Sequence, residues 1–170
     1  MLQGRYKVPV STHPESLLAK HEVGLFAENL AALRSCSHHR SDDVNRLILP
    51  QCQPMIEAIG HRMACDAAVA AGVKPALIDL YVASCLKVDA AWYVENAGIT
   101  RRALAYMETS ALDAVLPDLG SLISDMGIAP WVTSKIVSDQ RWQEFLGTCD
   151  VFSGESSFEG ITQQEMRSRL

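Results

Sequence analysis

The chain has 170 residues, of which 48% are hydrophobic and 21% are charged. This length and composition predict one folded domain with a sizeable core and exclude a mainly disordered chain. The net charge of −5 at pH 7, without a Lys/Arg cluster, excludes a double-stranded nucleic-acid binder, which needs a basic face.

The sequence indicates a soluble protein of a reducing compartment. Residues 1–11 contain no apolar stretch typical of a secretory signal, and no apolar run approaches the roughly 18 residues of a membrane span. The five cysteines are odd in number and form no C-x-x-C pair, so small buried thiols are expected rather than disulfides.

Two helices are predicted in the first half of the chain. Thr12 is a suitable cap for the first helix, with Pro14 in its first turn and apolar residues at helical spacing from Leu17 to Leu33. A polar loop over 35–40 ends this pattern. The second helical stretch is expected to restart or kink at its two prolines and to end at Gly72; the prolines are Pro50 and Pro54.

Two further long helices and one short helix follow. Pro75 begins a third helix that is expected to run to Gly98, and Thr100 caps a fourth. This fourth helix is expected to bend at Pro117 and to end at Gly127, and Ser138 caps a last short helix.

The capping residues, prolines and glycines at the expected helix ends predict an all-α fold. Four long amphipathic helices with short connections, and no convincing strand, favour an antiparallel bundle with a short C-terminal helix. We expect residues 1–150 to form this helical domain and residues 151–170 to form a flexible tail.

The last three residues are Ser168, Arg169 and Leu170. They are similar to the Ser-Lys-Leu signal that an import receptor reads as a peroxisomal address, and Arg keeps the charge and reach of Lys. The sequence therefore predicts a peroxisomal protein and the peroxisomal import receptor as a partner.

His61 is the only candidate catalytic residue that the sequence offers. It lies within an apolar helical pattern, and Cys65 follows four residues later on the same helix face. A nucleophilic pair also needs a thiol of lowered pKa and a third orienting group, so a hydrogen-bonded core or interface histidine is favoured.

Other polar groups point to no defined chemistry. Several possible zinc ligands lie in or near the first loop: His13, Cys36, His38, His39, Asp42 and Asp43. Their spacing fits no common zinc-ligand motif, so a solvated loop is favoured over a zinc site. The third helix is expected to carry either a buried polar network or a solvated edge at Asp79, Lys87 and Asp89. No glycine-rich phosphate loop is present.

Residues 77–100 resemble the C-terminal helical domain of the acyl-CoA oxidase family, in which a helix rich in Leu, Tyr and Ala ends in a turn such as Gly98-Ile99-Thr100. The segments 114–119 and 125–132 are similar to the family's next long helix and the step into its last segment. Residues 139–142 stand where the family often has a Gly-Arg-Tyr-Asp-Gly turn, but the glycines are missing. The resemblance covers roughly residues 50–150.

The resemblance implies flavin-dependent oxidation of a fatty acyl-CoA to the 2-enoyl thioester, with oxygen reoxidising the flavin. In this family the FAD-binding strands and the catalytic carboxylate lie in parts that this chain lacks, so no catalytic residue or cofactor is carried over. The chain is then expected to work with a flavin-bearing partner chain or as a homo-oligomer.

Two alternatives remain. The chain is a stand-alone helical relative that uses an apolar pocket for an acyl-CoA or another lipophilic small molecule, in binding or in a non-redox reaction such as a cyclisation, or it is a structural assembly module. His61 is the first candidate for such a pocket, and no metal ligand is predicted.

Overall fold

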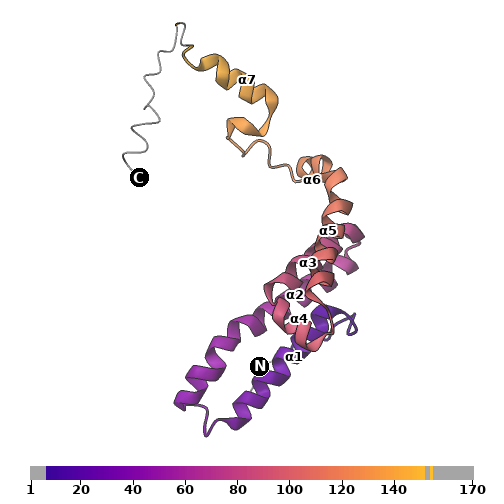
Figure 1. Cartoon of the computed structure of the whole chain (residues 1–170), viewed down its shortest axis with the longest axis vertical. Helices are drawn as coiled ribbons and strands as arrows, with labels where there is room; N and C mark the ends of the chain where they lie inside the picture. The colour runs from indigo at the N-terminus through magenta and orange to yellow at the C-terminus, as the bar shows by residue number, and fades with distance from the viewer. Residues whose placement is uncertain (1–6, 152–153, 155–170) are drawn as a thin grey trace, which may run out of the picture. The chain divides into compact units, whose positions relative to one another are not determined.

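The computed structural model describes residues 7–151 and 154. Every regular element in this range is a helix and no strand occurs there, which confirms the all-helical fold class (Figure 1). Contacts divide the chain into two compact units, Met1–Leu122 and Ile123–Leu170. No helix among the described residues is long and apolar enough to cross a membrane.

Helix α1 spans Leu17–Ser35 and begins later than the sequence suggests. Ser16, not Thr12, is its N-cap, and the Ser16 hydroxyl accepts a hydrogen bond from the Ala19 amide at 3.2 Å. The prediction that Thr12 caps this helix was wrong. Thr12 lies before the helix, and its amide donates a hydrogen bond to the Asp66 carboxylate at 3.3 Å.

Helix α2 spans Leu49–Ala70 and lies beside α1 (Figure 1). A five-residue π-helix, η1 (Val44–Ile48), leads into it, and Pro50 lies in its first turn, where a missing amide proton costs nothing. Pro54 is accommodated inside the helix. Gly72 follows with a φ of 70°, in the left-handed region that suits the end of a helix, as expected.

The predicted third helix is two helices. Helix α3 spans Pro75–Val88 and α4 spans Ala90–Asn96, with a break at Asp89, whose φ of −132° and ψ of 54° are not helical. Asp89 caps α4 by accepting a hydrogen bond from the Trp92 amide at 3.3 Å. The predicted end at Gly98 is confirmed, since this residue has a φ of 67°.

The predicted cap at Thr100 and the interruption at Pro117 are both present. Helix α5 spans Arg101–Val115, and the Thr100 hydroxyl accepts a hydrogen bond from the Ala103 amide at 3.1 Å. A short 3₁₀ turn, η2 (Leu116–Asp118), contains Pro117 and leads into α6, which spans Leu119–Asp125.

The hydrophobic core of the first unit is formed by side chains from α1 to α5. Tyr93 and Leu86 are completely buried, and Leu18 is nearly so. Trp92 of α4 lies so close to Gly24 of α1 that a Cβ atom at position 24 would overlap the indole ring. A glycine is therefore needed where these two helices approach each other.

The second unit contains the 3₁₀ turn η3 (Lys135–Val137) and helix α7 (Asp139–Thr148). Ser138 caps α7 as predicted, since its hydroxyl accepts a hydrogen bond from the Arg141 amide at 3.2 Å. None of the described residues of this unit is buried. The described residues of the second unit therefore form no hydrophobic core.

Candidate functional site

A pair formed by a buried histidine and a partly buried aspartate is the most unusual polar feature of the first unit. His21 lies on the inner face of α1 and is 6% exposed, and its Nε2 atom is 3.0 Å from Oδ2 of Asp89. Two aromatic rings of α4 hold the imidazole, because its centroid is 4.8 Å from the rings of both Trp92 and Tyr93. The imidazole thus has a fixed orientation.

The break between α3 and α4 places Asp89 for this contact. One carboxylate oxygen caps α4 through the Trp92 amide, and the other faces His21. An ionised carboxylate only accepts hydrogen bonds. The N–H group at Nε2 of His21 is therefore the hydrogen-bond donor to Asp89.

The His21–Asp89 pair lines a cavity of about 330 Å³ within the first unit. This volume lies at the lower end of the range for small-molecule sites, roughly 300–1,000 Å³. The cavity wall is mainly apolar, with Leu25, Ala58 and Val88 among its residues. Its polar residues come from α1, α2 and the α3–α4 break: His21, Gln51, Glu57, His61 and Asp89.

The candidate residue His61 lines this cavity, but no nucleophile accompanies it. Burial, with a further contribution from the charge of Asp66, raises the pKa of the neighbouring Cys65 thiol. Burial likewise raises the pKa of Cys85, which lies in the cavity wall. Both sulfurs are therefore held as thiols, the form that is a poor nucleophile.

Tyr81 connects α3 to α2 beside these thiols. Its hydroxyl donates to the His61 carbonyl oxygen at 3.4 Å, and its ring stands edge-on to the imidazole at 6.4 Å between centroids. Burial is the main reason that the pKa of Tyr81 rises to about 12. Tyr81 is therefore a neutral positioning group for His61.

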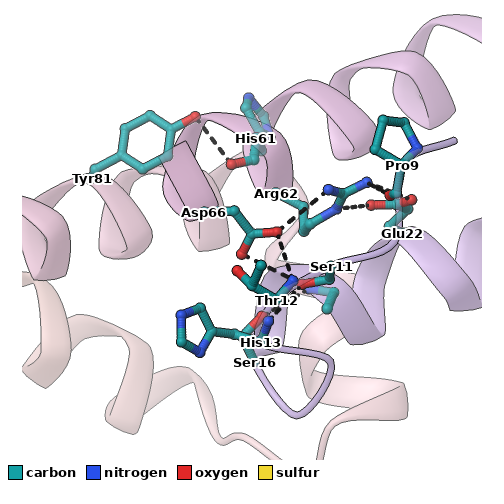
Figure 2. A network of polar contacts seen from close by, with 11 residues as sticks. Pro9, Ser11, Thr12, His13, Ser16, Glu22, His61, Arg62, Asp66 and Tyr81 are labelled. Carbon is teal, nitrogen blue, oxygen red and sulfur yellow. Dashed lines mark hydrogen bonds and ion pairs between the residues drawn. The ribbon is translucent and has the colours of Figure 1, made fainter. Parts of the chain in front are cut away.

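A second polar network surrounds Arg62, which is 3% exposed (Figure 2). Its guanidinium binds the Glu22 carboxylate with two hydrogen bonds of 2.6 and 3.2 Å. It also donates to Asp66 at 3.3 Å and to the Pro9 carbonyl oxygen at 2.8 Å. Arg62 thereby ties α1, α2 and the segment before α1 together.

The carboxylate of Asp66 completes this network from the other side. It accepts hydrogen bonds from the Ser11 hydroxyl at 3.4 Å and from the Thr12 amide (Figure 2). Burial alone would raise the pKa of Asp66, but the hydrogen bonds from Ser11, Thr12 and Arg62 outweigh burial and lower it. Four hydrogen bonds from the Arg62 guanidinium hold this network together in an interior position, so we assign the network a structural role.

Tyr93 contributes a buried hydroxyl beside the His21 ring. The residue is fully buried, and its hydroxyl has no hydrogen-bond partner among the described residues. Burial raises its pKa far above the ordinary value for tyrosine. Tyr93 belongs to the hydrophobic core of the first unit.

The other sequence candidates do not come together as a site. In the described part of the chain no group of three potential ligands could hold a metal ion. The third-helix residues separate: Lys87 pairs with Glu108 at 2.6 Å, whereas Asp89 pairs with His21. The tripeptide Ser168, Arg169 and Leu170 lies outside the described residues.

The residues around this cavity do not fit a flavin. A bound FAD carries a pyrophosphate, which needs backbone amides of a glycine-rich turn or basic side chains. The cavity wall instead presents Glu57 and Asp89 and no Lys or Arg. This cavity is therefore not an FAD site.

Sequence reasoning did not identify His21 or the pairing of Asp89. The two residues are 68 positions apart, and neither belongs to a spaced motif. One local signal was available. Asp is a preferred N-cap residue, so Asp89 could have predicted the start of a new helix at this position.

Comparison with known proteins gives no match: no family model, curated protein or solved structure is similar enough to this chain to be matched.

Proposed function

We propose that this chain is a helical domain of the acyl-CoA oxidase type that works with a flavin-bearing partner chain. The partner would supply FAD, which removes two hydrogens from the acyl-CoA and passes them to oxygen as hydrogen peroxide. The present chain would supply a helical surface that completes the partner. The resemblance of residues 77–100, 114–119 and 125–132 supports this proposal.

The observation that carries it is the uncovered apolar surface of the second unit. Trp131 is 84% exposed and Ile136 is 75% exposed, and Trp142 and Phe145 stack at 5.6 Å between centroids without being buried. Exposed aromatic residues in a unit without a core are typical of a surface that another protein covers.

A reconstitution experiment tests this proposal. The full chain is mixed with the flavin-bearing part of a peroxisomal acyl-CoA oxidase, and hydrogen peroxide release from palmitoyl-CoA is measured together with co-elution in gel filtration. We expect a complex and peroxide release above that of the flavin-bearing part alone. Separate elution with unchanged peroxide release would contradict the proposal.

A double variant, Trp131→Ser with Phe145→Ser, should abolish co-elution if the second unit forms the interface. The matched control is Tyr106→Ser on α5, which replaces an aromatic residue that is 74% exposed in the first unit. The control variant should still co-elute with the flavin-bearing part.

The proposal includes a peroxisomal location, read by the import receptor from Ser168, Arg169 and Leu170. A fluorescent protein that ends in residues 155–170 should collect in peroxisomes, and the same fusion with Leu170→Ala should stay diffuse. Diffuse fluorescence of both fusions would contradict this location.

The cavity favours a second candidate function, in which the chain binds a small molecule by itself. Its volume, its apolar wall and the fixed His21–Asp89 pair are features of small-molecule sites. An aromatic probe of suitable size tests this function without any partner chain. Its binding is detected by NMR, as chemical-shift changes of the cavity residues.

A further inference from the structure

We infer that the His21–Asp89 cavity binds a lipophilic organic cation, such as a primary amine on an aromatic or aliphatic body. This inference rests on the second candidate function, because it requires the cavity to accept a small molecule. It is independent of the flavin-bearing partner.

The charge of the cavity wall is the first argument. Glu57 and Asp89 contribute two carboxylates, and no Lys or Arg lines the cavity. Elsewhere in the first unit buried or half-buried carboxylates have basic partners: Glu22 and Asp66 pair with Arg62, and Glu108 pairs with Lys87. Asp89 is paired with the imidazole of His21, whereas Glu57 has no basic partner among the described residues, so a bound cation would complete the pairing of Glu57.

The hydrogen-bonding capacity of the wall is the second argument. The Asp89 carboxylate accepts two bonds, from His21 and from the Trp92 amide, and retains further lone pairs. Oε1 of Glu57 accepts a bond from Gln53 at 2.8 Å, and Oε2 has no partner among the described residues. The free lone pairs of these two carboxylates suit an ammonium group with three protons.

The apolar part of the wall is the third argument. Leu25, Ala58 and Val88 line the same cavity and suit a hydrocarbon body attached to the amine. A free metal ion does not fit the site, because no group of three potential ligands occurs among the described residues. An anion, such as a fatty acid, would face two carboxylates.

Three probes with the same ring and different charges test the inference: benzylamine, benzyl alcohol and phenylacetate. Each is titrated at neutral pH into the full chain, and chemical shifts of His21 and the backbone amides around Glu57 are followed by NMR. We expect benzylamine to bind about five-fold more tightly than benzyl alcohol, the ratio that one partly exposed ion pair provides. Phenylacetate should bind most weakly.

The variant Glu57→Gln removes one carboxylate while keeping the side-chain shape. It should weaken benzylamine binding several-fold and leave benzyl alcohol binding unchanged. The matched control is Glu95→Gln, at an exposed residue outside the cavity wall, which should bind both probes as the unaltered chain does. Glu57 is preferable to Asp89, whose replacement would also remove the cap of α4.

The outcomes separate the inference from the function on which it rests. If benzyl alcohol or phenylacetate binds at the cavity as tightly as benzylamine, the preference for a cation is wrong, although the cavity is a small-molecule site. If none of the three probes shifts the cavity residues, both the inference and the second candidate function are overturned.

Discussion

The two units of this chain bury their side chains to very different extents. The first unit encloses Tyr93, Leu86 and Leu18 and neutralises a buried arginine with two carboxylates. The second unit has apolar residues at helical spacing in α7, but none of its described residues is buried. The comparison teaches that amphipathic spacing predicts a helix, whereas a core requires several helices that pack against one another.

The largest expected loss of stability follows from breaking the Arg62 network. The substitution Arg62→Ala leaves the Glu22 and Asp66 carboxylates, each with a side chain 15% exposed, without their cation. We expect a loss of about 3–5 kcal/mol in the free energy of unfolding, measured by urea denaturation. The exposed pair of Lys74 and Asp118 provides the control, since Lys74→Ala should cost less than about 1 kcal/mol.

A core substitution sharpens the comparison of the two units directly. Leu86→Ala creates a cavity at a fully buried position of the first unit and should cost about 2–5 kcal/mol by the same measurement. Ile136→Ala removes a side chain that is 75% exposed in the second unit and should change stability by less than about 0.5 kcal/mol. Equal losses at the two positions would show that the second unit has a core after all.

Glycine substitutions probe the close approach of α1 and α4. Gly24→Ala forces a methyl group against the Trp92 ring and should cost about 1–3 kcal/mol in thermal or urea unfolding. Gly60→Ala is the matched control, because a Cβ there meets no atom and alanine favours the helix by about 0.5–1 kcal/mol. The two variants should therefore shift stability in opposite directions.

The smallest expected effect concerns acid. The lowered pKa of Asp66 means that the unfolded chain binds a proton more readily than the folded chain does. This contribution to stability is complete above the ordinary Asp pKa, and it is lost as the pH falls through the lower pKa of the folded state. Asp66→Asn should reduce the slope of stability against pH in this acidic range, and an unchanged slope would contradict this assignment.

Helix ends governed by neighbouring residues were predictable from the sequence. Thr100 and Ser138 cap helices through hydrogen bonds to amides three residues ahead, and Gly98 adopts its left-handed conformation for local reasons. Thr12 and Asp89 were not predictable, because contacts with Asp66 and His21, more than 50 positions away, determine their roles.

The candidate site was only partly predictable for the same reason. His61 was identified as a polar residue on an apolar helix, and it does line the cavity. The His21–Asp89 pair depends on how α1 packs against the α3–α4 junction, and no spacing in the sequence encodes this packing. Glu57 belongs to no spaced motif, and among the described residues its only polar contact is the side chain of Gln53.

The double use of Asp89 has a dynamic consequence. Because the same carboxylate holds the first turn of α4 and the imidazole in the cavity wall, opening of that turn and reorientation of His21 are thermodynamically linked. An occupant that strengthens one contact therefore shifts the opening equilibrium of the other towards the closed state. The hydrogen-exchange rate of the Trp92 amide would thus report the binding of a ligand in the cavity.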